Sequence, residues 1–467
     1  MSRYRYLLKN VGLLTLSSFA TKLLSFLMVP LYTSVLTTEE YGTYDVFSTT
    51  VSVLLPILTL NIQEGVLRYA LDKSADRKAI VTVGVRWTLV GITLVGIGLF
   101  VALWTGLFTM GQRYALYFFL LFFSQALSGL VLFYVRGIDL ITDLSISSVI
   151  ASVVIIGFNL LFLLVFRWGL DGYFLANIIG PLVQVAYLLV RTHMLGDIRP
   201  DRRYQSETRL LISYSVPLIA NSIAWWVTSV SDRYVVIFFC GLAANGIYSV
   251  ASKIPSILTV FQTIFSQAWT LSVVKDYDPD DKDGFFANTY AAYNCVLTLV
   301  CSVIIVADKA LARFLYANDF YAAWQYVPWL TIAIIFGALS NYVGGFFTAV
   351  KDSRGFAQSS VAGAVTNVAL NLVLVPLVGP MGAAVSTAIC YVEVWVLRLW
   401  RSRRYIRLKI NLKRDVTTYV LLCVQSVALT NMANQVAMYA LVVVLFVVIV
   451  ALHSGEIARV AKKVMRG

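Results

Sequence analysis

Long apolar runs alternate with short polar connections from one end of the chain to the other. A run of about 20 apolar residues forms a helix long enough to cross the hydrocarbon core of a bilayer, which is about 30 Å thick. The runs are continuous rather than alternating, and a helix satisfies its own backbone hydrogen bonds in lipid. The pattern predicts fourteen spanning helices, at residues 11–36, 41–67, 79–108, 113–135, 144–166, 171–191, 209–240, 245–272, 286–307, 327–350, 356–378, 380–397, 415–431 and 435–453.

Composition agrees with this pattern. The 467 residues are 59% hydrophobic and only 13% charged, with a mean hydropathy of +0.79. Soluble domains contain about 25% charged residues. The connections are too short to hold a soluble domain. We therefore predict an all-α integral membrane protein.

The net charge of +13 is distributed in a way that indicates membrane topology rather than nucleic-acid binding. Basic residues cluster between the apolar runs, as in 68–78, 191–209, 398–414 and 459–466. An even number of spans places both termini on one side, and most Lys and Arg residues fall on that side. The opposite connections contain four basic residues: Arg113, Arg167, Lys309 and Arg313. The positive-inside rule then predicts cytoplasmic termini and a multi-pass protein of the cytoplasmic membrane.

The two halves of the chain resemble each other. The segment Gly42-Thr-Tyr-Asp-Val-Phe-Ser aligns with Gly246-Ile-Tyr-Ser-Val-Ala-Ser, and Gly169-Leu-Asp-Gly172 parallels Gly379-Pro-Met-Gly382. The common order indicates a duplicated six-helix unit in a parallel repeat. We predict pseudo-symmetric lobes at 1–195 (helices 1–6) and 209–400 (helices 7–12), a basic cytoplasmic linker at 196–208, and helices 13 and 14 with a tail at 401–467.

Two lysines inside apolar runs are the main candidates for function. A charged residue at the bilayer centre costs about 2.5–3.5 kcal/mol, so such residues tend to face water or a partner. Lys22 and Lys253 have no acidic neighbour in sequence, which suggests a cationic cavity wall that binds a phosphate or pyrophosphate anion. The alternatives are a structural ion pair, for example with Asp232 or Glu64, and snorkelling toward the interface.

Other polar residues of the spans are weaker candidates. Glu64 and Arg68 lie four residues apart on one helix face, which is typical of a surface ion pair or a topology charge. Arg86 is assigned to the same cavity or to snorkelling. Amides that could bind a sugar occur at Asn61, Gln63, Asn221 and Gln262.

Acidic and basic groups further along the chain are candidates for gating or for coupling to an H⁺ or Na⁺ gradient: Asp232, Arg233 and Glu393. The five cysteines and two histidines lack metal-ligand spacing, so no metal site is predicted. The chain contains no phosphate-binding Gly-x-x-x-x-Gly-Lys-Ser/Thr motif, so no ATP hydrolysis or other cofactor is expected.

Several segments, in a common order, resemble a known family. Ser231-Asp-Arg-Tyr through Lys253-Ile-Pro resembles the seventh-to-eighth helix signature of bacterial polysaccharide flippases of the multidrug/oligosaccharidyl-lipid/polysaccharide exporter superfamily. The stretch Leu36-Thr-Thr-Glu-Glu-Tyr-Gly-Thr-Tyr resembles their first extracellular turn, and Gly379-Pro-Met-Gly-Ala-Ala-Val-Ser-Thr resembles the start of their twelfth helix. The similarity extends over nearly the whole chain.

The resemblance implies a transporter rather than an enzyme. It would move a polyprenyl-pyrophosphate (undecaprenyl pyrophosphate) linked oligosaccharide from cytoplasm to exterior by alternating access, with Lys253 and Lys22 at the headgroup in an inter-lobe cavity. The prenyl tail would lie along a groove beside helices 13 and 14. Related lipid II flippases carry an Arg-Asp pair where this sequence has Met28-Val29. That departure favours an O-antigen (lipopolysaccharide), capsule, exopolysaccharide or teichoic-type unit, with a polysaccharide polymerase and glycosyltransferases as partners.

Two other interpretations remain open from sequence. An ion-coupled multidrug or metabolite exporter of the same superfamily would expel organic cations, for which intramembrane carboxylates are needed, whereas unpaired cations dominate here. A membrane polymerase or ligase would need acid/base groups on a large external loop. The longest external connection, about 308–326, contains Asp308 and Asp319 but no histidine.

Overall fold

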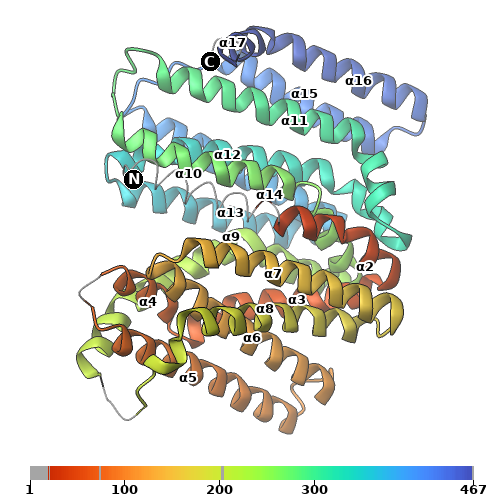
Figure 1. Cartoon of the computed structure of the whole chain (residues 1–467). Coiled ribbons are helices and arrows are strands. Elements are labelled where there is room, and N and C mark those ends of the chain that lie inside the picture. The colour runs from red at the N-terminus through yellow and green to blue at the C-terminus, as the bar shows by residue number, and fades with distance from the viewer. Residues whose placement is uncertain (1–18, 20, 73–74, 201–203, 465–467) are drawn as a thin grey trace. The chain divides into compact units, whose positions relative to one another are not determined.

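The computed structural model describes residue 19 and residues 21–72, 75–200 and 204–464. Its regular elements are all helices within these ranges (Figure 1). The chain divides into two compact units, Met1–Val230 and Ser231–Gly467. The lobe boundaries at 195 and 209 that the repeat suggests stay a prediction.

The amino-terminal unit begins, within the described residues, with a short apolar helical stretch, Thr21–Val35, whose second part is α2. The beginning of the first predicted span, residues 11–18, lies outside the described residues. The elements of this unit are α2 (Val29–Val35), α3 (Thr38–Leu58), α4 (Ile62–Ala70), α5 (Arg77–Trp104), α6 (Gln112–Gly137), α7 (Ile141–Asn159), the π-helical turn η1 (Leu160–Val165), α8 (Leu170–Thr192), the 3₁₀ turn η2 (Met194–Asp197) and α9 (Gln205–Ala251) as far as Val230.

The predicted second span is broken in the structure. It starts with a capping box, in which Thr37 accepts from the backbone N–H of Glu40 and the Glu40 carboxylate accepts from the backbone of Thr37. It then bends by 63° between α3 and α4. Leu60 and Asn61 adopt left-handed backbone angles there, which ends one helix and starts the next.

A hydrophobic cluster holds α4–α8 and the start of α9 together. Its buried members include Val66 of α4, Val81 of α5, Val131 of α6 and Leu188 of α8. The helix α5 is apolar on nearly all of its sides. Its buried residues are therefore those that contact neighbouring helices, rather than those of a single hydrophobic face.

The carboxy-terminal unit contains the second part of α9 and the remaining helices. These are α10 (Ser256–Lys275), α11 (Phe285–Leu315), the 3₁₀ turn η3 (Asn318–Gln325), α12 (Val327–Ala349), α13 (Ser353–Val378), α14 (Pro380–Ser402), α15 (Leu412–Asn431), α16 (Gln435–Leu452) and α17 (Ser454–Val464). Aromatic rings fill the centre between α10, α11 and α12, where Trp269 stacks on Tyr342 with ring centroids 3.9 Å apart. The helix α12 is the most deeply buried of the unit's spans.

The predicted eighth span, 245–272, is also interrupted. The helix α9 turns at Gly241, whose φ of 87° and ψ of 175° are non-helical, and ends at Ala251. A turn at residues 252–255 precedes α10. Pro255, which has no backbone N–H, stands at the end of this turn and directly precedes α10. Lys253 lies in this turn.

The repeated glycine pairs have matching conformations. Gly169 and Gly379, each directly before a helix, have φ values of 54° and 65° with ψ values of −130° and −151°. Gly172 and Gly382 stand where a side chain would meet neighbouring atoms: a Cβ would lie 2.7 Å from Phe162 Cβ and 2.5 Å from the Leu374 carbonyl. The two halves therefore use the first glycine for backbone freedom and the second for close approach.

Eleven helices within the described residues are long and apolar enough to cross a membrane, and twelve if α3 and α4 count as one bent span. The helix α15 and the amino-terminal part of α9 cover the thirteenth and seventh predicted spans, although neither is among those helices. The chain is a multi-pass membrane protein.

Candidate functional site

The two lysines predicted from sequence are both without a side-chain partner among the described residues. Lys22 lies on the helical stretch before α2, and its side chain is exposed. Lys253 is half-buried in the turn between α9 and α10. The proposed ion pairs with Glu64 or Asp232 do not form in this part of the chain. Each unit thus has one unpaired ammonium group within a region that is otherwise apolar.

Local backbone bonding fixes the position of Lys253. Its N–H donates to the carbonyl of Val250 at 2.9 Å, and its own carbonyl accepts from the Ser256 hydroxyl at 2.6 Å. The break therefore leaves the Lys253 side chain free while the backbone on both sides is held. Irregular backbone at membrane depth is tolerated where it is buried in protein or lines a water-filled cavity.

A polar groove of about 390 Å³ follows α10 directly after this turn. Thr259, Gln262, Thr263, Ser266 and Thr270 of α10 line it together with Asn341 of α12. The α10 residues are spaced three, four and seven apart, so they share one helix face. The predicted sugar-binding Gln262 is thereby placed among hydroxyl and amide groups. We call this feature the α10 groove.

The amides predicted in the amino-terminal unit lie around the break between α3 and α4. The buried Asn61 has its Nδ2 3.4 Å from the Ser222 hydroxyl of α9. The exposed Asn221 is the neighbouring residue of α9. Gln63 packs against α6 at Gly129, where an added Cβ would meet the Gln63 Oε1 atom. The structure brings Asn61 and the 221–222 region together but directs Gln63 into packing.

Further bonds tie α9 to this break. The Gly65 N–H donates to the Ser215 hydroxyl at 3.1 Å, and the Trp226 indole N–H donates to the Thr49 carbonyl at 3.1 Å. These bonds join α9 to both α3 and α4. Backbone groups that the break leaves without helical partners are thus partly satisfied by α9.

The charged residues of the amino-terminal unit have structural neighbours. Glu64 is half-buried with the Arg136 charge of α6 nearby, whereas Arg68 is exposed. Arg86 of α5 donates to the Pro200 carbonyl at 2.8 Å. Arg86 therefore contacts the segment that leads to α9. This contact accounts for a charged residue in the span, and no ligand is needed to explain it.

Asp232 is the centre of a polar network in the carboxy-terminal unit. It is 7% exposed, its Oδ2 accepts from the Tyr248 hydroxyl at 2.5 Å, and its Oδ1 accepts from the Arg233 N–H at 2.9 Å. Asp232 and Tyr248 lie on either side of the turn at Gly241. The Thr387 hydroxyl of α14 lies beside the Tyr248 hydroxyl.

The network continues into α13. Asn367 donates to the Thr387 hydroxyl at 3.3 Å, and Asn371 donates to the Asn367 amide oxygen at 3.0 Å. The Asn371 Oδ1 atom is buried and has no hydrogen-bond partner within the described residues. The Asp232 network is defined as Asp232, Tyr248, Thr387, Asn367 and Asn371. It offers carboxylate, hydroxyl and amide oxygens, the donors that hard cations and protons favour.

The other predicted coupling residues lie near the Asp232 network. Cys390 of α14 lies close enough to Asp232 and Glu393 to be influenced by both charges. Glu393 is half-buried, and its Oε2 atom is buried without a hydrogen-bond partner in the described part of the chain. Arg233 is half-buried beside Asp232. Within the same described part, no cluster of three or more His, Cys, Asp or Glu side chains could hold a metal ion.

A second groove is apolar. It has a volume of about 730 Å³ and lies between α12, α14 and α15, within the carboxy-terminal unit. Its lining includes Trp329, Phe336, Ile389, Val420 and Val424. It lies beside α15, which covers the thirteenth predicted helix, and the expected tail groove stays a prediction. Its size and chemistry suit a hydrocarbon chain.

Sequence reasoning missed most of the Asp232 network. Tyr248, Thr387, Asn367 and Asn371 had no assigned role. One signal was present: Asn367 and Asn371 are four residues apart on a single face of an apolar helix. The polar face of α10 was likewise visible as a spacing pattern, of which only Gln262 was selected.

Comparison with known proteins places this architecture. A family model described as polysaccharide biosynthesis protein matches residues 7–270, more than half of the chain. The chain belongs to that family. No curated protein is similar enough in sequence to count as a relative.

Solved structures with the same fold are transporters and flippases rather than enzymes. The lipid II flippase MurJ in an inward closed conformation has a TM-score of 0.69 at 13% identity, over 95% of this chain and 98% of that one. An inward-facing multidrug resistance MATE transporter of the MOP superfamily has a TM-score of 0.64 at 13% identity, over 88% and 96%. A MOP superfamily transporter from Pyrococcus furiosus has a TM-score of 0.56 at 12% identity, over 91% and 97%. The predicted fold class is confirmed by these structures, and the predicted relation to polysaccharide biosynthesis proteins by the family match.

Proposed function

We propose that this protein flips a polyprenyl-pyrophosphate-linked oligosaccharide repeat unit across the cytoplasmic membrane by alternating access. The observation that carries the proposal is the Lys253 ammonium, unpaired among the described residues, in the turn directly before α10 and the α10 groove. A cation suits a pyrophosphate, and hydroxyl and amide groups suit a sugar. The order of these groups matches the order of headgroup and glycan in such a lipid.

The apolar groove between α12, α14 and α15 supports a lipid substrate over a water-soluble one. A prenyl chain in this groove would stay in an apolar environment while the headgroup crosses. Lys22, in an apolar helical stretch of the amino-terminal unit, has no partner among the described residues, and we propose a role for it in headgroup binding as well. Met28-Val29 favours a glycan of the O-antigen, capsule, exopolysaccharide or teichoic type.

Reconstituted vesicles provide the direct test. A fluorescent polyprenyl-pyrophosphate glycan is added, and its protection from an external glycan-cleaving enzyme is followed. Wild type is compared with Lys253→Ala, Lys253→Arg, Lys22→Ala and a control, Lys409→Ala, which removes an exposed charge from a connection. Loss of a charge-assisted hydrogen bond costs about 1.5–3 kcal/mol, so Lys253→Ala is expected to weaken binding about 10- to 100-fold.

Lys253→Arg is expected to keep part of the transport, and the control all of it. Full transport by Lys253→Ala with loss in Lys253→Arg would refute the charge role. Absence of transport of any lipid-linked glycan by well-folded wild type would refute the flippase itself. An exporter of organic cations would then be examined by drug-efflux measurements.

We further propose that the Asp232 network couples transport to an H⁺ or Na⁺ gradient. Transporters place coupling ions near discontinuous helices, and Asp232 and Tyr248 flank the turn at Gly241. Asp232→Asn keeps the shape but removes the charge. It is expected to abolish the response to an imposed gradient while leaving lipid binding intact. An Asp232→Asn variant that still responds to both gradients would contradict the coupling role.

We also propose that both termini are cytoplasmic and that the flipped unit is passed to a polysaccharide polymerase after glycosyltransferases have built it. The distribution of basic connections supports this orientation. Carboxy-terminal fusions to a fluorescent protein and to alkaline phosphatase report the side directly. An active phosphatase fusion together with a non-fluorescent fluorescent-protein fusion would show that the carboxy terminus lies outside the cytoplasm.

A further inference from the structure

The last helix, α17, follows the apolar helix α16 after a single residue, His453. It covers only Ser454–Val464, which at 1.5 Å per residue is far too short to cross a bilayer. The backbone bond from the Ile457 N–H to the His453 carbonyl, at 3.0 Å, starts it directly at the end of the span. The helix therefore begins at the boundary between the hydrocarbon core and the headgroups.

The sequence of α17 is strongly two-sided. Ile457, Val460, Ala461 and Val464 recur at three- and four-residue steps and share one side of the helix. The basic residues Arg459, Lys462 and Lys463 occupy the opposite side by the same spacing. Ile457 is 36% exposed although it belongs to the apolar side. This pattern is typical of helices that lie in a membrane interface.

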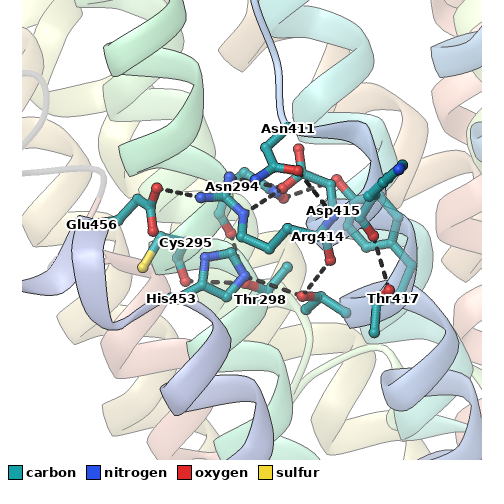
Figure 2. Close-up of polar contacts among 12 residues, drawn as sticks. Asn294, Cys295, Thr298, Asn411, Arg414, Asp415, Thr417, His453 and Glu456 are labelled. Carbon is teal, nitrogen blue, oxygen red and sulfur yellow. Dashed lines mark hydrogen bonds and ion pairs between the residues drawn. The ribbon is translucent and has the colours of Figure 1, made fainter.

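A polar cluster fixes α17 to the rest of the carboxy-terminal unit (Figure 2). The Arg414 guanidinium at the start of α15 forms ion pairs with Asp415, at 2.8 Å, and with Glu456 of α17. The buried His453 contacts the Thr418 hydroxyl through Nε2 at 3.2 Å. The cluster is well shielded, because the Arg414 side chain is only 10% exposed. The buried contacts of Glu456 and His453 thus hold α17 in place.

One further bond joins α17 to α11. Arg459 donates to the Asn288 amide oxygen at 2.8 Å. The neighbouring segment 403–413, which joins α14 to the first turn of α15, adds exposed positive charge at Arg403, Lys409 and Lys413. The acidic connection before α11 lies at the same end, but Asp280 pairs with Arg407 and Asp281 accepts from the α11 backbone. Positive charge therefore flanks α17 on the side of α15, whereas Asp276, Asp278 and Asp283 keep the connection before α11 acidic.

We propose that α17 is an interfacial helix that binds anionic phospholipid headgroups through its basic side. The apolar side would enter the acyl boundary, where the partial exposure of Ile457 is relieved. Negative surface charge attracts basic residues near a bilayer, with about 1 kcal/mol for each Lys or Arg. This site is independent of the proposed headgroup site at Lys253.

Hydrogen exchange of the full-length protein in lipid nanodiscs tests the proposal. Amide exchange in peptides covering α17 is compared between discs of phosphatidylcholine alone and discs with one part in three of phosphatidylglycerol. The expected result is several-fold slower exchange in the anionic discs, which fades as salt is raised because exposed charges are screened. Lys462→Gln/Lys463→Gln is expected to weaken anionic lipid binding about 25-fold, from about 1 kcal/mol per charge.

Lys409→Gln/Lys413→Gln is the matched control, since it removes the same charge from the neighbouring connection, and it is expected to retain the effect. Equal exchange of wild-type α17 in both lipids would overturn the proposal and leave the basic side for a protein partner. An equal loss in the control would overturn it too, because general charge would then explain the effect. The wild-type salt series decides the question even where a variant folds poorly.

Discussion

Gly382→Ala tests the close approach of α13 and α14. A Cβ at this position would lie 2.5 Å from both the carbonyl carbon and oxygen of Leu374, and 2.7 Å from the Val375 nitrogen. These are backbone atoms, so no side-chain rotation relieves the clash. Overpacking costs about 1–3 kcal/mol, and the clash with backbone places this site near the upper end.

Part of that cost is offset, because alanine favours a helix over glycine by about 0.5–1 kcal/mol. The net loss is expected to be about 2 kcal/mol. At roughly 2–4 °C per kcal/mol for a unit of this size, the melting temperature should fall by about 4–8 °C.

The change in melting temperature is measured by heating the purified protein to a series of temperatures and quantifying the remaining folded protein by size-exclusion chromatography. Gly157→Ala is the control, because a Cβ there meets no atom within 4 Å. It is expected to leave the melting temperature unchanged or slightly raised. If Gly382→Ala and the wild type have the same melting temperature, α13 and α14 do not approach each other as described.

Three further substitutions have expected outcomes. Gly172→Ala, the repeat counterpart of Gly382→Ala, should also lower the melting temperature, since a Cβ would lie 2.7 Å from Phe162 Cβ; an unchanged value would break the parallel between the halves. The buried Arg398 donates to the Ser359 and Ser360 hydroxyls and to the Ser340 carbonyl at 2.8–3.0 Å. Arg398→Lys lacks the planar guanidinium, so its free energy of unfolding, measured by thermal unfolding, should fall by about 2–4 kcal/mol, nearly as much as that of Arg398→Met. Wild-type stability of Arg398→Lys would refute this role. Bonds from the Gly355 N–H and the Tyr405 hydroxyl lower the pKa of Asp352, so its contribution to stability is present above the unfolded pKa of about 3.9 and is lost as pH falls through the lower folded value. Between pH 5 and 3 the wild type should therefore lose more stability than Asp352→Asn. Parallel pH profiles of stability for the two proteins would contradict this prediction.

Sequence alone determined the class of the protein and much of its helical order. Hydropathy is a local sum over about 20 residues, so it finds spans without knowledge of their neighbours. The paired glycines were also readable, because a left-handed turn before a helix and a close contact both need glycine locally. The unpaired state of Lys253 was anticipated for the same reason: no acid lies near it in sequence.

Tertiary structure decided which polar groups meet. Asp232 and Asn371 are far apart in sequence, and only the packing of α9, α13 and α14 joins them through Tyr248 and Thr387. Arg398 looked like a topology charge in a basic cluster but is 3% exposed and donates three hydrogen bonds to α12 and α13. Hydrogen bonds act over about 3 Å in space, and a linear pattern does not specify that distance for side chains on different helices.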